Sequence, residues 1–300
     1  RQTPNVVRWL RAELPHCKRV VNHHLKFDAH MLLNLGIVVP MQRAECTMIR
    51  AALIDEHLLK YDLDSLLGRY LGQSKATEIY EQLAALFGGK PTKSVQMKNI
   101  SRAPASIVGP YAKMDTRGAL NLWHWQEDEI ASQGLRQVVD LEQRLLRHIF
   151  SMERAGIRVD EELAVDKVKM LDIEISKQRA ALNKLAGAEI NPNPSGSIRE
   201  LFKPTRRDDG KWVANDGTVL ATTDAGAPSL SAEALERMKH PAAGAILRVR
   251  KLMKTRDTFI SGHILGHAHK GYVHPNINQT KGDDTGGTGT GRLSYTGPAL

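Results

Sequence analysis

Helical periodicity in the second half of the 300-residue sequence constrains the fold more than any other feature. Apolar residues recur at helical spacing over 134–155, 161–186 and 241–263, which predicts three long helices. The segment 203–229 between the last two is rich in Gly and Asp and leaves room for a small hairpin only. This half of the chain is therefore expected to be mostly helical, with few strands.

The first half of the chain has a different pattern. A short β-branched run at residues 19–22 predicts a buried strand among amphipathic helices. This change of pattern places a domain boundary near 130–140, and we set the two domains at 1–133 and 134–300. The helices predicted in the first domain are 5–14, 28–35, 45–55, one capped by Asp62 and ending near Gly72, 74–87, and one containing Tyr111, Asp115 and Leu122.

Composition limits the class of protein and of partner. The net charge of +9 favours a polyanionic partner such as a nucleic acid, although scattered surface lysines would give the same sum. Two cysteines provide no disulfide framework and indicate a reducing compartment. No apolar run is long enough for a bilayer and no signal peptide is recognisable, so a cytoplasmic protein without a membrane partner is expected. Both ends resemble cuts within a longer protein.

Two polar clusters in the first domain can carry chemistry. In NHHLKFDAHML, residues 22–32, Asp28 is expected at the start of a helix, where a carboxylate is favourable for capping alone. In YAKMD, Tyr111 and Asp115 are four residues apart and share a helix face. Such a pair can hold a metal-bound water. Taken singly, a helix cap and an exposed helical pair remain the simpler interpretations.

Taken together with the segment 46–72, the two clusters resemble the second and third motifs of the 3′–5′ proofreading exonucleases of family A DNA polymerases. The resemblance implies a partial RNase H-like α/β domain. It also implies that Asp28 and Asp115 are two of four carboxylates that bind two divalent ions, Mg²⁺ or Mn²⁺, and that Tyr111 positions the attacking water. The first motif, an Asp-x-Glu on a strand, is expected upstream. His24 occupies the position of the family's usual Asn, and Asn22 lies two residues earlier.

The second half resembles the thumb and the start of the palm of the same polymerases. The matching segments are 141–160, 190–202, 223–235, 246–260 and 273–298, and the last contains GRLS. A polymerase grips DNA through phosphate contacts that ignore sequence. The matching Arg of the family, here Arg292, reaches minor-groove acceptors that every base pair offers in nearly the same place. The residues expected to contact DNA are Asn193, Ser195, Arg250, Lys254, Gln279 and Arg292.

The resemblance implies a function for the parent protein and leaves two alternatives. The parent is expected to be a DNA-directed DNA polymerase with proofreading, and the extended loop between Phe202 and Thr223 resembles phage-type more than bacterial members. Its partners would be primer-template DNA, a single-stranded 3′ end and deoxynucleoside triphosphates, with any processivity factor unknown. The polymerase metal ligands are expected downstream. An exonuclease of the RNase D kind does not explain the second half, and a non-catalytic DNA-binding module would describe the isolated segment. A zinc site among the twelve histidines is disfavoured.

Overall fold

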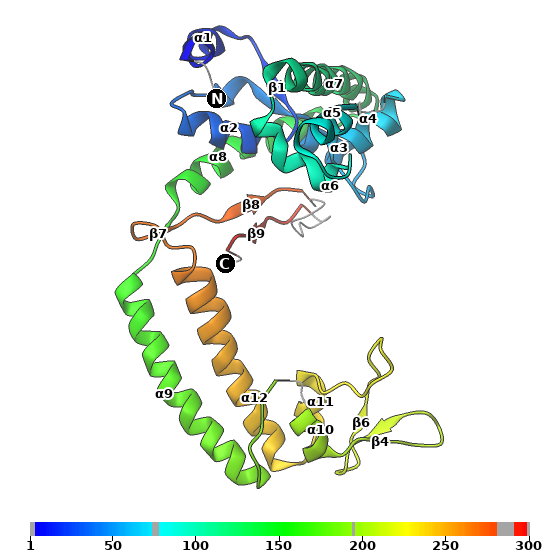
Figure 1. Ribbon diagram of the computed structural model, residues 1–300, viewed down its shortest axis with the longest axis vertical. Coiled ribbons are helices and arrows are strands. Elements are labelled where there is room, and N and C mark those ends of the chain that lie inside the picture. Colours follow the sequence, from blue (N-terminus) through cyan, green and yellow to red (C-terminus); the bar gives the residue numbers. More distant parts are fainter. Residues whose placement is uncertain (1–3, 74–77, 194–195, 281–290, 299–300) are drawn as a thin grey trace. The chain divides into compact units, whose positions relative to one another are not determined.

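The computed structural model describes residues 4–73, 78–193, 196–280 and 291–298. The chain forms two compact units (Figure 1). The first unit contains residues 1–155 and 275–296, and the second contains residues 156–274 and 297–300. A hairpin from the end of the chain therefore belongs to the first unit. The domain limits at 133 and 134, which rest on the change of sequence pattern and not on contacts, stay a prediction.

The first unit is an assembly of helices around a short parallel pair of strands. Strands β1 and β2 pair in parallel, with Val20 opposite Ala44, and the hairpin strands β8 and β9 pair antiparallel. The elements are α1 (Pro4–Glu13), η1 (Leu14–His16), β1 (Val20–Asn22), α2 (Leu25–Asn34), η2 (Met41–Arg43), β2 (Ala44–Cys46), α3 (Thr47–Ile54), α4 (Leu63–Leu71), α5 (Glu78–Phe87), α6 (Lys93–Gln96), η3 (Met97–Arg102), α7 (Ala105–Ser132), α8 (Arg136–Ala155), β8 (Asn276–Asn278) and β9 (Ser294–Thr296).

Local signals fix several of these elements. The predicted cap of α4 is confirmed, because Asp62 accepts a hydrogen bond from the Ser65 amide at 3.2 Å. Gly72 ends that helix in the left-handed conformation, with φ of 61°. Helix α2 was predicted to begin at Asp28 but begins at Leu25. His24 has a φ of 53°, and the chain leaves strand β1 at this residue. Helix α2 can therefore begin three residues before Asp28.

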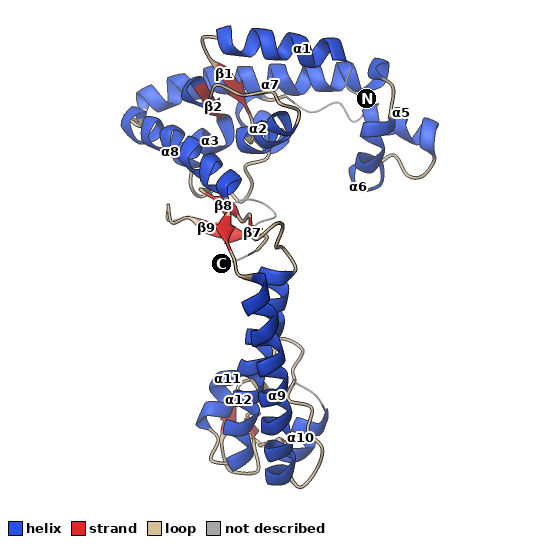
Figure 2. Ribbon diagram, turned by 90° about the vertical axis from the view of Figure 1, so that its left-hand side faces the viewer, coloured by secondary structure: helices blue, strands red, loops and turns tan. Residues whose placement is uncertain are grey.

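The second unit is dominated by two long helical segments that lie side by side (Figure 2). Strands β3 and β7 pair antiparallel at one end, and β4, β5 and β6 form a three-stranded antiparallel sheet. The elements are β3 (Ile157–Arg158), α9 (Glu161–Ala186), α10 (Gly196–Phe202), β4 (Thr205–Arg206), β5 (Trp212–Val213), β6 (Val219–Leu220), α11 (Ala232–Arg237), α12 (Pro241–Lys254), the π-helix η4 (Thr255–Leu265) and β7 (Tyr272–Val273).

The mostly helical character expected for this unit is present. The small hairpin expected around Trp212 is a three-stranded sheet. The helix expected over 241–263 changes its hydrogen bonding at Thr255, where the π-helix η4 begins. Apolar spacing does not distinguish the two helix types, because both place side chains around one axis. No described helix has the length and apolar character needed to cross a membrane.

Candidate functional site

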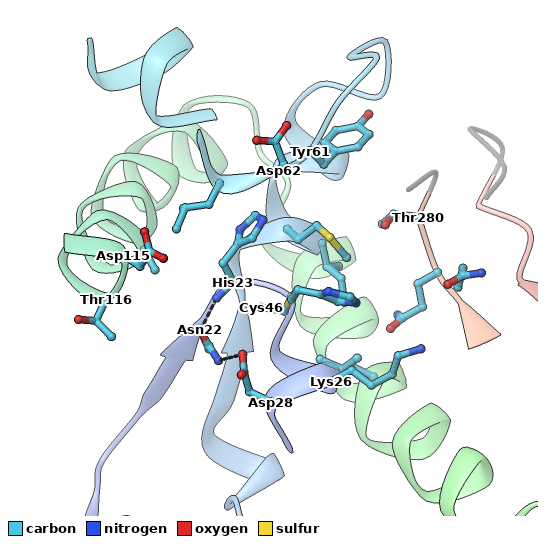
Figure 3. A pocket seen from close by; sticks show the side chains of 18 of the residues that line it. Asn22, His23, Lys26, Asp28, Cys46, Tyr61, Asp62, Asp115, Thr116 and Thr280 are labelled. Atoms are coloured by element: carbon cyan, nitrogen blue, oxygen red, sulfur yellow. Dashed lines mark hydrogen bonds between the residues drawn. The ribbon is translucent and has the colours of Figure 1, made fainter. Parts of the chain in front are cut away.

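A cavity of about 750 Å³ in the first unit gathers the three residues that the sequence predicted for catalysis. Asp28 comes from α2, whereas Tyr111 and Asp115 come from α7. Figure 3 shows Asp28 and Asp115 on these two different helices at the cavity. Other polar side chains that line it are those of Asn22, His23, Lys26, Asp62, Asn278 and Thr280.

Asp28 is held by a residue at the end of the neighbouring strand. Asn22 donates a hydrogen bond from Nδ2 to Asp28 Oδ2 at 2.6 Å, and its own Oδ1 accepts one from the His23 amide at 2.8 Å. Burial raises the pKa of Asp28, and the hydrogen bond from Asn22 opposes that rise. The Asn that contacts this carboxylate is therefore two residues upstream of the position that the family pattern uses.

His24 has a different role from the Asn it replaces. Its backbone is the left-handed N-cap of α2, and its ring stacks on Phe27 with centroids 5.9 Å apart. Burial lowers the pKa of the His24 imidazole, and Lys26 lowers it further.

Helix α7 is fixed close to its neighbours near the point where it presents Asp115. A Cβ atom at Gly118 would lie 2.6 Å from Leu67 Cδ1 of α4, so any larger residue there would require the Leu67 side chain to move. Further along α7, the Gln126 side chain donates to the Thr47 carbonyl at 2.9 Å. Both contacts limit rotation of α7 about its axis, and this fixes the face that carries Tyr111 and Asp115.

The third side of the cavity comes from β8 and the two residues after it, which are more than 150 residues away from Asp115 in the sequence. Gln279 donates from Nε2 to the Glu142 carbonyl at 3.1 Å and to its carboxylate at 2.9 Å. Gln279 was expected to contact DNA, and in the structure it joins β8 to α8. The sequence offered no sign that residues 276–280 would lie beside the two motifs, because only tertiary packing brings them there.

The other residues expected to contact DNA are distributed over both units. Arg292 is exposed in the first unit. In the second, Asn193 and Lys254 are exposed, and Lys254 Nζ lies 5.8 Å from the centre of the Phe259 ring. Arg250 is half-buried and donates to the carbonyls of Pro192 at 2.5 Å and Leu230 at 3.0 Å. Burial lowers its pKa. Ser195 lies outside the described residues. Their contacts with DNA stay predictions.

The chemistry of the cavity suits a hard divalent cation. Asp28 and Asp115 offer carboxylate oxygens, which Mg²⁺ and Mn²⁺ prefer over nitrogen or sulfur. Across the described residues, no group of three or more His, Cys, Asp or Glu side chains is arranged to hold a metal. Both cysteines are free, and Cys46 is buried. Asp28 and Asp115 thus correspond to two of the four carboxylates that the resemblance implies.

Comparison with known proteins connects these features to a family. The model of a 3′-5′ exonuclease domain of family A polymerases matches residues 8–130. DNA polymerase DpoZ of Acinetobacter phage SH-Ab 15497 is 56% identical over 307 aligned residues, which cover 100% of this chain and 49% of that protein. DNA polymerase I of Pseudomonas aeruginosa is 27% identical over 98% of this chain and 31% of its own length.

The fold agrees with a solved polymerase. The POL domain of Pol1 from M. smegmatis, in complex with DNA primer-template and dNTP, superimposes with a TM-score of 0.69 at 20% identity. The alignment covers 100% of this chain and 45% of that one. The predicted α/β exonuclease region followed by a helical region is thereby confirmed. The chain spans about half the length of the phage polymerases that it matches. Residues 8–130 thus match a 3′–5′ exonuclease domain, and the chain as a whole is similar to about half of a phage DNA polymerase and to part of a DNA polymerase I.

Proposed function

We propose that the whole protein carries out template-directed DNA synthesis and proofreads with a 3′–5′ exonuclease whose active site is the cavity of the first unit. One observation carries the exonuclease assignment. Asp28 and the pair Tyr111 and Asp115 belong to separate motifs of the sequence, yet they line the same cavity. The exonuclease-only alternative is disfavoured, because relatives that match the full length of this chain are named DNA polymerases.

The side chains have distinct roles in this proposal. Asp28 and Asp115 would hold the metal ions, and Asn22 would keep the Asp28 carboxylate in one orientation. Bound divalent ions, proposed here as two Mg²⁺ or Mn²⁺, would supply charge stabilisation for the attacking and leaving oxygens of phosphodiester hydrolysis. The Tyr111 hydroxyl, one helical turn from Asp115, would orient the attacking water toward the phosphorus.

The substrates follow from the same assignment. A single-stranded 3′ end would enter the cavity, and primer-template DNA and dNTPs would serve the polymerase of the whole protein. The net charge of +9 and the exposed lysines of α12 support a phosphate-contacting surface in the second unit. The cytoplasm, of a bacterial host if the protein is encoded by a phage, remains the predicted location.

Excision of a mismatched primer end by the full-length protein tests the proposal. We expect Asp28→Ala and Asp115→Ala each to slow Mg²⁺-dependent excision by about 100-fold to 1,000-fold, because each would remove several kcal/mol of charge stabilisation. Extension of a matched primer by the same samples should stay unchanged and serves as the control for folding. Normal excision by both variants would show that the exonuclease site lies elsewhere.

A further inference from the structure

Helix α2, which carries Asp28, is also attached to a buried ion pair through Lys26, whose side chain borders the same cavity. Lys26 and Glu153 are 7% and 6% exposed, and Lys26 Nζ lies 2.5 Å from Glu153 Oε1. The ammonium group also donates to the Ile277 carbonyl at 2.5 Å and to Asn276 Oδ1 at 3.0 Å. One buried cation thus joins α2 to both α8 and β8.

The Glu153 carboxylate completes the connection. Its Oε1 accepts a second hydrogen bond from the Ile277 amide at 2.5 Å, and its Oε2 accepts one from His30 Nε2 at 2.7 Å. Because a carboxylate only accepts, His30 must carry its proton on Nε2 here. We name Lys26, His30, Glu153 and their contacts with Ile277 the α2 clamp. It lies entirely within the first unit.

Helical geometry relates the clamp to the catalytic carboxylate. Lys26 and His30 are four residues apart and share one face of α2. Asp28 lies two residues from each, about 200° around the helix axis, so its side chain leaves the helix in a different direction, although Lys26 and Asp28 both border the cavity. In Figure 3 the Lys26 side chain extends toward the strand that leads to Thr280, while Asp28 lies beside Asn22. The clamp therefore sets the rotation of α2 that determines where Asp28 points.

A contribution to the stability of the fold does not by itself explain why Lys26 and Glu153 are buried as an ion pair. Burying two charges costs several kcal/mol per ion, and well-packed apolar side chains of similar volume often serve as well or better. Hydrogen bonds, unlike apolar contacts, are directional and fix both the position and the rotation of a helix. A site in which two carboxylates from different helices must share metal ions requires that precision.

We propose that Lys26 and Glu153, assisted by His30, are positioning residues of the exonuclease: they lock α2 against α8 and β8 so that Asp28 is aligned with Asp115. This inference rests on the proposed exonuclease function. It assigns the hairpin strand β8, from the segment that resembles the palm, a part in the exonuclease site. The residues act through α2 and have no contact with the scissile phosphate in this scheme.

The test uses the full-length protein with Lys26→Met, Glu153→Gln and the milder His30→Gln. Mn²⁺ binding is followed by electron paramagnetic resonance at the sites that Asp28→Ala abolishes, and excision of a single-stranded 3′ end is measured in parallel. We expect Lys26→Met and Glu153→Gln to weaken Mn²⁺ binding about 10-fold to 100-fold, as loss of a supporting residue typically does. Excision kcat should fall similarly with KM little changed, and His30→Gln should show the same changes at smaller size.

The matched control is Gln96→Leu, which breaks buried hydrogen bonds elsewhere in the same unit. Gln96 is fully buried and donates to the carbonyls of Gly88 at 2.9 Å and Lys90 at 3.1 Å, which lie on neither α2 nor α7. It should lower thermal stability while Mn²⁺ affinity and excision stay within about twofold. If the clamp variants behave like Gln96→Leu, the inference is wrong. If Glu153→Gln fails to fold, unchanged Mn²⁺ affinity in His30→Gln overturns it equally.

Failure of the proposed function would look different. In that case Asp28→Ala itself would leave both excision and Mn²⁺ binding unchanged, whatever the clamp variants do. If Asp28→Ala abolishes excision and the clamp variants do not alter it, only the positioning role is lost.

Discussion

The interiors of the two units differ in how many polar and charged side chains they bury. The second unit surrounds its helices with an apolar cluster that includes Leu182, Ile198, Phe202 and Ile246, each with no exposed side-chain surface. The first unit has apolar clusters as well, but they are interrupted by polar groups. Among the described residues, all the buried polar and charged side chains belong to the first unit: Lys26, Thr47, Arg50, Gln96, Asn99, Gln126 and Glu153.

The difference follows from what each unit is proposed to do. Metal-dependent hydrolysis requires carboxylates held in fixed directions, and buried hydrogen bonds such as those of Arg50 and Glu153 supply direction. Gripping a duplex requires only a stable shape that carries cations on its surface. In the second unit, ion pairs such as Arg256 with Asp172 at 2.6 Å accordingly stay at the surface. Buried polar groups are thus found in the unit to which the exonuclease chemistry is assigned by our proposal.

The apolar core of the second unit should be the most sensitive to loss of volume. We expect Phe202→Ala to destabilise this unit by about 3–5 kcal/mol, because it leaves a cavity where the ring now packs. Hydrogen exchange measured by mass spectrometry should show lost protection in α9–α12. Phe259→Ala, at a site that is 47% exposed, is the control and should cost about 0.5 kcal/mol. Equal losses would contradict the assignment of the core.

The proposed excision reaction of the first unit should depend on the hydroxyl group of Tyr111. We expect Tyr111→Phe to slow excision of a mismatched end about 10-fold to 100-fold, because the ring remains but no longer orients the water. Tyr70→Phe removes a hydroxyl from the same unit, in a ring stacked on Trp125 outside the cavity lining. Its excision rate should match the wild type. A Tyr111→Phe protein with a normal rate would exclude the hydroxyl from the reaction.

Lysines of the second unit should contribute to affinity for DNA rather than to excision. Lys251 and Lys254 are exposed on α12, and we expect replacing both with Ala to reduce the salt dependence of primer-template binding. Each lost phosphate contact should lower the slope of log K against log salt by about 0.9. Lys90→Ala with Lys93→Ala removes the same charge from the first unit. An equal change in slope there would mean that only net charge matters.

The smallest expected effect concerns the stability of the two units in acid. We compare one hydrogen-bonded aspartate from each unit. Burial opposes ionisation of Asp62 and Asp216, but hydrogen bonds from Ser65 and Thr218 respectively outweigh it, and both pKa values lie below the ordinary 3.8. Their ionisation therefore stabilises the fold above pH 3.8 and ceases to do so as the pH falls through the folded values.

Asparagine at either position keeps one of the two acceptor oxygens and removes the titration. Asp62→Asn and Asp216→Asn should each flatten the acid limb of the stability curve, in the first and second unit respectively. Urea unfolding followed by regional hydrogen exchange, from neutral pH to about pH 3, measures this. Curves that remain parallel to the wild type would show that neither carboxylate is linked to folding.

Local features were predictable from the sequence, and long-range ones were not. The cap at Asp62 and the helix end at Gly72 depend on neighbours within a few residues, so residue preferences were sufficient. The meeting of Asp28 with Asp115 was implied only by resemblance. The contact of Lys26 with Ile277 joins residues 251 positions apart, and no local preference encodes it.

Arg250 shows the limit of a charge pattern. The sequence assigned it, with Lys254, to a phosphate-contacting face of one helix. The side chain instead lies half-buried against two carbonyls, whereas Lys254 is exposed. A cationic residue has the same signature in a sequence whether its head group meets solvent or backbone oxygen. Only packing decides between them.

A double-mutant cycle on the two motif carboxylates tests the central claim that they serve one site. Single-turnover excision of a mismatched end would be measured for full-length Asp28→Asn, Asp115→Asn and the double variant. Residues that act as a unit are strongly non-additive, so the double variant should excise no more slowly than the slower single variant. Losses that multiply in the double variant would show that Asp28 and Asp115 act independently, and would contradict a shared exonuclease site.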